Sequence, residues 1–579
     1  MHHQFLKALA HLSLQRRLAI GAVLLCAVAL ALRASTIVDL STFLLNRQDR
    51  WLLLAQAVIL IVIGERLRGR SRPLEIPRSG LIATAVIVVG FCYFGHYLVL
   101  SGYDLSRDEQ MAVFDAEIFS SGRLVQPLPA FWQQHAAALN TLFMLPVERP
   151  VAWVSAYLPV NSLLRAVVGM VVDPAFTAPI LTAIGLLALY KCARSLWPED
   201  REAPAIACLF YLSSGQVLFA GMTAYAMPAH LTFNLVWLWL FLASSWQADM
   251  AALVIGFAAT GLHQPLFHPL FVLPFMLLLV RDRAWTRLVY YGIGYAIICG
   301  FWLVWPIWIH GQIAGPNSIT ATAGTDYWSR LKLALADTAD ARWTDMAANV
   351  LRFAAWQNML LVPFMLMGAA LARRHCMALV FLANILIPLG LMALILPFQG
   401  YGFGYRYLHG ALGSVILLAV YGWRQLAAQQ EQNQARSLIV RSIVTTAALV
   451  LPLQLWMAHR NYVVFSSVEQ RVATSGTDYF AVGGADTSFS GDLVINRPDL
   501  SNRPIRFYAE VLRKPFIRKI CASTPRIGLP TTRLFGPIDS YFLASPDPIA
   551  DRRIASLKPV LQAAGCSVII IDAPAVDRF

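Results

Sequence analysis

The sequence predicts a polytopic α-helical membrane protein, with amphipathic interfacial helices in its first large outer loop and a small C-terminal α/β extracytoplasmic domain. Three observations support this fold class. Of the 579 residues, 58% are hydrophobic and 13% are charged, so polar side chains are too few to cover a soluble protein of this size. Apolar runs of about 20 residues, the length that crosses a bilayer, recur through the first four-fifths of the chain. The remaining fifth is polar and rich in Pro and Arg.

The apolar runs predict about thirteen transmembrane helices. The first run, 18–32, follows basic residues like a signal peptide, but no small-residue cleavage site follows it, so we interpret it as a span. We assign residues 1–458 to a transmembrane domain. Its predicted spans lie near 15–34, 51–65, 80–100, 174–195, 203–221, 229–246, 250–263, 265–280, 288–311, 349–371, 375–396, 406–424 and 437–458.

Basic residues in the short connections predict the orientation, because such residues are enriched on the cytoplasmic side of a membrane. With the spans above, six basic groups fall on one side, which we assign to the cytoplasm. The loop after Ser101, the segment 312–348 and the tail after His459 then lie on the extracytoplasmic side. The basic groups are Arg16 and Arg17; Arg66, Arg68, Arg70, Arg72 and Arg78; Lys191 and Arg194; Arg281, Arg283 and Arg287; Arg373 and Arg374; and Arg424, Arg436 and Arg441.

The net charge of +14 therefore reflects topology, and we predict no nucleic-acid partner. The eight cysteines show no metal-ligand spacing, and we predict neither a metal ion nor another cofactor. Cys521 and Cys566 share the polar tail, where an extracytoplasmic location would permit a disulfide. Two cysteines in one domain do not decide whether that bond forms.

The first outer loop, 101–173, is long for a connection, and we predict that it carries the catalytic site. Two stretches are typical of helices lying in the membrane interface, Glu109–Ser121 and Phe131–Phe143. The tail, 459–579, contains strand-like segments at 492–495 and 566–572 and a helical pattern at 548–564. These patterns predict a small soluble α/β domain.

The acidic cluster that opens the outer loop supplies the candidate catalytic residues. Asp108 and Glu109 are adjacent carboxylates, and Asp104 lies one helical turn earlier. Carboxylates at the junction of a span and water can act on a lipid head group, whereas the alternative interpretation is an ordinary solvated loop. The long amphipathic loop behind them favours the first interpretation.

Polar groups at other outer ends of spans are candidates for substrate binding. Arg406 offers a fixed cation to a phosphate, although an Arg flanked by Tyr405 and Tyr407 also suits an interfacial anchor. Arg123, in the turn after the first interfacial helix, is a second candidate for the phosphate. His230 and His263 are candidates for a substrate pocket. Alternatively, His230 caps a helix and His263 satisfies backbone groups that a Pro break leaves unpaired.

The order of these motifs resembles the GT-C superfamily of polyprenyl-phosphate-dependent glycosyltransferases, which includes protein O-mannosyltransferases and lipid A aminoarabinose transferases. The resemblance covers roughly 101–423. Two features depart from the family: three spans precede the acidic motif instead of one, and His263-Gln264-Pro265 stands where relatives often show Arg-Pro. The motifs that carry it are Asp108-Glu109, 120–124, 153–164, 215–230 and Tyr405-Arg406-Tyr407.

The resemblance implies transfer of a sugar, with inversion, from an isoprenoid phosphate to a glycan, lipid or protein acceptor at the outer face of a bacterial inner membrane. Asp108 would be the catalytic carboxylate with Glu109 beside it, and Arg406 and Arg123 would bind the donor phosphate. Asp104, Tyr405, His230 and His263 would line the substrate pocket.

Two other classes of function remain open at this stage. A transporter or flippase of a lipid-linked sugar would also need many spans with polar breaks, but it should show charges inside the spans and a repeat relating its halves. We find few such charges and no evident repeat. A non-catalytic assembly subunit with an outer sensor domain is the third class, and it predicts no donor turnover. The sugar, the isoprenoid length and the oligomeric state do not follow from the sequence.

Overall fold

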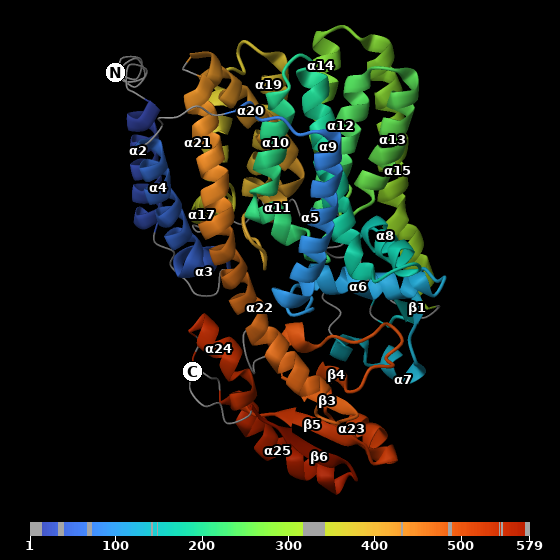
Figure 1. The fold of residues 1–579 in the computed structure, drawn as a ribbon. Coiled ribbons are helices and arrows are strands. Elements are labelled where there is room, and N and C mark those ends of the chain that lie inside the picture. Colours follow the sequence, from blue (N-terminus) through green and yellow to red (C-terminus); the bar gives the residue numbers. More distant parts are fainter. Residues whose placement is uncertain are drawn as a thin grey trace. The chain divides into compact units, whose positions relative to one another are not determined.

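The computed structural model describes residues 14–32, 40–65, 72–139, 143–147, 149–315, 342–429, 432–483, 489–543, 545 and 548–573. The chain divides into two compact units, each built from three stretches of sequence (Figure 1). Unit 1 holds Met1–Gly95, Ala175–Trp302 and Asp326–Met457. Unit 2 holds His96–Pro174, Leu303–Thr325 and Ala458–Phe579.

Among its described residues, the regular elements of unit 1 are all helices (Figure 1). The helices that lie wholly or mostly in it are α2 (Leu14–Ala31), α3 (Leu40–Leu44), α4 (Arg50–Glu65), α5 (Arg78–Leu98), α9 (Thr177–Leu196), α10 (Glu202–Leu212), α11 (Gly215–Ala220), α12 (Met227–Ala243), α13 (Trp246–Thr260), α14 (Phe267–Arg281), α15 (Trp285–Ile313), α17 (Arg342–Ala355), α18 (Leu361–Ala369), α19 (Cys376–Ile395), α20 (Leu412–Gln429) and α21 (Gln432–Thr445).

Each predicted span coincides with one helix or with two consecutive helices. Among the described residues, six helical stretches are long and apolar enough to cross a membrane, and shorter apolar helices accompany them. The six are Arg78–Leu98, Pro174–Leu196, Trp285–Ile313, Cys376–Ile395, Arg406–Ala428 and Gln432–Ala473. The prediction of a polytopic α-helical membrane protein is therefore confirmed. The predicted outer segment 312–348 falls largely on 316–341, outside the described residues.

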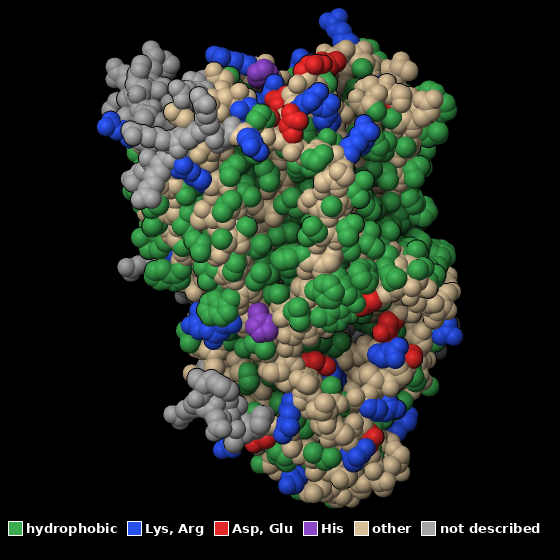
Figure 2. All heavy atoms as spheres, viewed as in Figure 1, with side chains coloured by type: hydrophobic (Ala, Val, Ile, Leu, Met, Phe, Trp, Pro, Cys, Tyr) green, Lys and Arg blue, Asp and Glu red, His purple; other side chains and the backbone are tan. Residues whose placement is uncertain are grey.

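The surface of unit 1 fits a lipid environment. Large apolar side chains on α5 and α15 are exposed, including Val86, Ile87, Ile293 and Ile297. Figure 2 shows hydrophobic side chains covering the flanks of the helices, with charged side chains gathered toward the helix ends. Helices with apolar side chains on their exposed faces are stable only where another apolar phase covers them.

Two predicted spans are each divided into a pair of helices, and buried amides join the two breaks. α10 and α11 are separated at Ser213 and Ser214, and α17 and α18 are separated around Gln357. The hydroxyl of Ser214 donates to Gln357 Oε1 at 2.6 Å, and Gln357 Nε2 donates to Gln216 Oε1 at 3.0 Å. These side chains bond groups that a broken helix would otherwise leave unpaired inside the apolar unit.

Unit 2 combines the first outer loop with the tail (Figure 1). The loop holds α6 (Arg107–Ser120), β1 (Gln126–Pro127), α7 (Ala130–Gln133), β2 (Ala152–Trp153) and α8 (Val160–Gly169), with β1 antiparallel to β2. The tail follows α22 (Leu451–Ala473) and holds β3 (Tyr479–Val482), β4 (Ile505–Tyr508), α23 (Lys514–Ile520), β5 (Arg526–Pro530), α24 (Gly536–Phe542), α25 (Ile549–Ala563) and β6 (Ser567–Ile571).

The tail strands form one parallel sheet in the order β4-β3-β5-β6. Tyr479 of β3 pairs with Ile505 of β4 and with Ile527 of β5, and Arg526 of β5 pairs with Ser567 of β6. The predicted C-terminal helix and the strand after it correspond to α25 and β6. A parallel sheet with helical connections is the α/β architecture that the tail sequence predicts.

Two local predictions in unit 2 differ from the structure. The segment 492–495 is not a strand: Ser490–Leu493 is a 3₁₀ turn, and the carbonyl of Val494 accepts a bond from Arg107. The second interfacial helix is reduced to α7 and a 3₁₀ turn, Ala136–Leu139, among the described residues. In both places side-chain and packing contacts with distant segments replace the regular hydrogen bonds that the local pattern favours.

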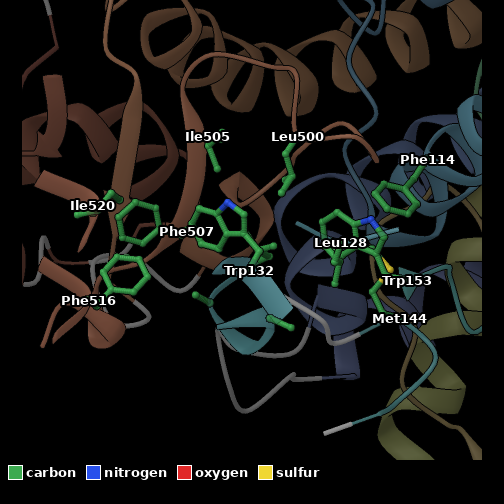
Figure 3. Close-up of a cluster of buried hydrophobic side chains, with 14 of the residues drawn as sticks. Phe114, Leu128, Trp132, Met144, Trp153, Leu500, Ile505, Phe507, Phe516 and Ile520 are labelled. Carbon is green, nitrogen blue, oxygen red and sulfur yellow. The ribbon is translucent and has the colours of Figure 1, made fainter. Parts of the chain in front are cut away.

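A shared hydrophobic core holds the two parts of unit 2 together (Figure 3). Phe114, Trp132 and Trp153 come from the outer loop, and Phe507 and Phe516 come from the tail. The Trp132 ring lies 6.0 Å from that of Phe507, centroid to centroid, and the indole N–H of Trp153 donates to Pro498 O at 2.8 Å. Burying aromatic side chains of this size fixes the outer loop against the tail.

Cys521 and Cys566, whose pairing the sequence left open, form a disulfide with their Cα atoms 4.9 Å apart. The bond links the turn after α23 to the start of β6.

Candidate active site

α6 begins with a capping box that fixes the acidic pair. The hydroxyl of Ser106 accepts the backbone N–H of Glu109 at 3.3 Å, and the N–H of Ser106 donates to Glu109 Oε2 at 3.0 Å. Both reciprocal bonds satisfy N–H groups that the first helical turn cannot pair. Asp108 and Glu109 therefore lie in the first turn, where the helix dipole stabilises negative charge.

The two adjacent carboxylates have different surroundings. Glu109 is 1% exposed, its side chain completes the cap, and the Tyr462 hydroxyl lies 3.5 Å from its Oε2. Asp108 is half-buried, and its Oδ1 accepts a hydrogen bond from the hydroxyl of Tyr157. Asp108 is therefore the carboxylate of the pair that retains exposed surface, whereas the contacts of Glu109 are those of a helix cap.

A buried cation that the sequence analysis did not select lies behind the acidic turn. Arg165 projects from α8, which packs along α6, and it is 6% exposed. Asp104, Glu109 and Asp173 provide the negative charge around it. A single Arg inside the apolar segment 160–169 was the available signal, because a charge in such a segment needs a partner.

A second buried acid shares the face of α6 that carries Asp108, seven residues further along. Asp115 accepts the N–H of Ser155 at 3.0 Å and the hydroxyl of the same residue. Burial raises the pKa of Asp115 to about 7, against the opposing effect of these hydrogen bonds. Asp115 therefore anchors the segment that carries Tyr157 and does not reach solvent.

The structure does not bring Arg123 to Asp108. Arg123 is exposed after the C-terminal end of α6, where it donates to Gln126 Oε1 at 3.4 Å. A helix rises about 1.5 Å per residue, so roughly 20 Å separate the two side chains. Asp104 lies just before α6 and is half-buried; its Oδ1 has no hydrogen-bond partner within the described part of the chain.

In unit 1, Arg406 begins a 3₁₀ turn, Arg406–Ala411, ahead of α20. Its guanidinium carbon lies 4.9 Å from the ring centre of Tyr225 and 5.8 Å from that of Tyr407. Gly402 permits this placement, since a Cβ there would lie 2.5 Å from Cδ of Arg406. The aromatic faces limit the positions open to the cation and stabilise its charge.

The other predicted pocket residues of unit 1 lie near this segment. Tyr405 is fully buried, and its carbonyl oxygen accepts a hydrogen bond from Nε2 of Gln216 at 2.8 Å. His230 is buried beside Phe267, and neither of its ring nitrogens has a hydrogen-bond partner among the described residues. His263 is half-buried and lies near His230. The two histidines therefore lie near each other. Tyr405 is instead held by the hydrogen bond from Gln216, which has a structural role.

Within the described ranges, no three His, Cys, Asp or Glu side chains form a group that could hold a metal ion. Independence from metal remains a prediction of the chemistry proposed below.

Comparison with known proteins finds similarity in fold. No protein-family model and no curated protein matches the chain. The crystal structure of ArnT from Cupriavidus metallidurans bound to undecaprenyl phosphate has a TM-score of 0.51 and 12% identity, and the match covers 73% of this chain and 86% of ArnT. The apo form of the same protein has a TM-score of 0.46 and 11% identity, over 82% and 91% of the two chains. The match to the bound form of ArnT shows that this chain has a similar fold, as the sequence resemblance led us to expect.

Proposed function

We propose that this chain is an integral-membrane glycosyltransferase that moves a sugar from a polyprenyl-phosphate donor to an extracytoplasmic acceptor, with inversion at the anomeric carbon. The GT-C fold supports the general class, and the similar structure of ArnT contains undecaprenyl phosphate. The observation that carries the proposal is the accessible carboxylate of Asp108, held in the first turn of α6 by a complete capping box.

Asp108 acts as the general base in this proposal. A carboxylate oxygen of Asp108 accepts the proton of an acceptor hydroxyl as the hydroxyl oxygen attacks the anomeric carbon. The new glycosidic C–O bond forms on the face opposite the phosphate, and the bond between the anomeric carbon and the phosphate oxygen breaks. The polyprenyl phosphate leaves with the bonding electron pair, and the transferred proton remains on Asp108.

Arg406 is the proposed ligand of the donor phosphate. A monophosphate gains negative charge as it leaves, and a cation that is already in position lowers the free energy of that transition state. Arg406 meets this requirement because Tyr225 and Tyr407 fix its guanidinium. This step uses a protein cation where other phosphate chemistry uses a metal ion, which is why we expect no dependence on divalent metals.

Glu109 and Arg165 act as positioning residues in the same account. Glu109 fixes the direction of the first turn of α6, and Arg165 balances the charge of the buried acidic groups. The predicted side of the reaction follows from the basic connections and is the periplasmic face of a bacterial inner membrane. The acceptor is a glycan, lipid or protein hydroxyl.

The test is transfer of radiolabelled sugar from synthetic polyprenyl-phosphate donors by the purified full-length protein, with and without a chelator. We expect transfer or donor hydrolysis that is indifferent to chelation and is lost in Asp108→Asn. Asp551→Asn is the matched control. Asp551 is an exposed carboxylate in the first turn of α25, and it accepts hydrogen bonds from Thr532. Donor binding without turnover across the panel would favour a flippase or an assembly subunit, and sensitivity to the chelator would contradict the metal-free mechanism.

A further inference from the structure

Unit 2 contains a cavity of about 350 Å³ on a different face of α6 from Asp108. Arg107, Gln110 and Phe114 line it and form one stripe of the helix, at positions i, i+3 and i+7. Asp108 lies on the stripe that faces Tyr157. The cavity has the size of a small-molecule site, about 300–1,000 Å³.

Five buried polar atoms on residues that line the cavity have no hydrogen-bond partner within the described part of the chain. An unpaired buried donor or acceptor costs about 1–3 kcal/mol. Several such atoms around one cavity therefore indicate that the cavity binds a polar ligand. The side chains of Tyr103, Arg107, Gln110 and Arg506 are each at least nine-tenths buried. The atoms are Tyr103 Oη, Asp104 Oδ1, Arg107 Nη2, Gln110 Oε1 and Arg506 Nε.

These atoms offer both donors and acceptors. The two guanidinium nitrogens can only donate, and the carboxylate and amide oxygens of Asp104 and Gln110 can only accept. Burial raises the pKa of Tyr103 well above its usual range, so its phenol remains a neutral hydroxyl that can do either. A ligand that pairs with all of these atoms must both donate and accept hydrogen bonds at several positions. A molecule with several hydroxyl groups has this property.

The charge around the cavity is already balanced. Arg506 binds Glu469 through both terminal nitrogens, and Arg107 Nε lies 3.6 Å from Asp492 Oδ1. Arg497 pairs with Glu117 at 3.2 Å. An anionic ligand would therefore meet carboxylates as well as cations, and a neutral ligand has the better electrostatic fit.

Two aromatic rings complete the wall. Phe114 and Trp153 contact edge to face, with ring centroids 5.1 Å apart. The indole N–H of Trp153 is already bonded to Pro498 O, so the ring offers the cavity apolar surface. A pyranose has an apolar face of C–H groups and a rim of hydroxyls, and it matches this combination of aromatic and polar groups.

The geometry points to a binding site for a neutral saccharide, of monosaccharide size, between α6 and the tail of unit 2. It is separate from the face that carries Asp108, and it does not rest on the proposed transferase activity. A sugar bound there bridges α6 residues to Arg506 of β4 and so holds the acidic helix against the tail sheet.

The test is ligand-observed NMR binding on the full-length protein in detergent, with glucose, galactose, mannose and N-acetylglucosamine as probes and inorganic phosphate as the anionic comparison. We expect saturable binding of at least one sugar and at least a tenfold loss of affinity in Tyr103→Phe. The unfolding temperature of this variant without sugar should not fall, because the hydroxyl that it removes has no protein partner. Tyr479→Phe, a half-buried tyrosine outside the cavity lining, should bind as the wild type does.

Asp108→Asn separates this site from the active site, and it should retain the affinity for the sugar. Loss of binding in Asp108→Asn would place the sugar in the active site and overturn the proposal. Absence of saturable binding across the panel would show that the cavity holds only water, and preferential binding of phosphate would overturn the ligand class. Wild-type affinity in Tyr103→Phe would show that the sugar binds elsewhere.

Discussion

Adjacent acidic residues in one helical turn can differ completely in what they can do. Asp108 keeps exposed surface and one tyrosine partner, whereas the carboxylate of Glu109 is used in the cap of its own helix. The family resemblance ranked Asp108 first, but the residues alone gave no physical reason for that order, because the difference comes from which side of α6 faces the tail and which faces 152–157. The structure therefore assigns them separate roles in the proposed mechanism.

In the proposed mechanism, Tyr157 is expected to orient the carboxylate of Asp108. Its hydroxyl donates a hydrogen bond to Oδ1 of Asp108. Tyr157→Phe should lower the rate of sugar transfer by roughly fivefold with little change in donor KM, since loss of one hydrogen bond costs about 1 kcal/mol. Steady-state kinetics with a synthetic donor measure this split. A rise in KM without a loss of rate would instead make Tyr157 a donor-binding residue.

Asp115 is expected to make stability depend on pH. The folded chain holds the proton of this buried carboxyl up to a pKa of about 7, whereas an unfolded chain releases it near pH 4. The folded state therefore binds more protons in this window, and the contribution of Asp115 to stability falls as the pH rises from about 4 to 7. Asp115→Asn can still accept a hydrogen bond from Ser155, and it should make the loss of stability with rising pH smaller.

The measurement is the unfolding temperature of the full chain in detergent across this pH range. The wild type and Asp551→Asn should show the same slope, and the slope of Asp115→Asn should be shallower. An unchanged slope in Asp115→Asn would mean that other groups cause the pH dependence.

Arg165 and Asp115 show which site residues the sequence did not reveal. Ser155, the partner of Asp115, lies 40 residues away in the chain, and Asp104 and Glu109, which face Arg165, lie more than 50 residues from it. The motif at 104–110 was visible because several polar residues are adjacent in sequence. Residues joined only by the folding of α6 on α8 leave no such local pattern.

At the scale of elements, the capping box decides where α6 starts. Ser106→Ala removes one of its two bonds and should cost about 1 kcal/mol of local stability. Hydrogen exchange of the amides in the first turn of α6 should then be roughly fivefold faster, because about 1.4 kcal/mol corresponds to a factor of ten. Ser120→Ala, at the other end of the helix, removes only a bond to Ala116 O and is the control. Equal exchange in the two variants would contradict the capping role.

Most elements were predictable because their signals are local. Runs of apolar residues located the spans, and the serine, the acidic pair and the apolar residues that follow located α6 within a few residues. The errors have one physical cause. At 492–495 and 134–139 the local pattern favours a strand and a helix, but contacts with distant residues of unit 2 determine the backbone.

At the scale of the whole molecule, the amino-acid composition predicted a membrane protein, whereas contacts between distant residues determine the division into two compact units. No local feature indicates that 96–174 and 458–579 share a core, because their contacts, such as that of Trp153 with Pro498, join residues separated by 345 positions. The sequence nevertheless placed both segments on one side of the membrane. The basic residues in the connections therefore predicted that these two segments are able to pack together.

The disulfide is expected to stabilise the tail of unit 2. Cys521→Ala/Cys566→Ala removes a cross-link across 45 positions and should lower the free energy of unfolding by about 2–4 kcal/mol. Thermal unfolding of the full chain measures this loss, and Cys376→Ala, which removes a half-buried free thiol, is the control. Titration of the denatured, unreduced chain should find the six other thiols free. Eight reactive thiols would contradict the bond.

The rate of sugar transfer by Asp108→Asn and Glu109→Gln, measured side by side with one active donor, tests the central claim most directly. Loss of a general base costs about 10²–10⁴ in rate, so Asp108→Asn should fall by that factor. Glu109→Gln should stay within tenfold of the wild type, because glutamine also completes a capping box. Transfer near the wild-type rate by Asp108→Asn, or an equal loss in the two variants, would contradict the assignment of Asp108 as the base.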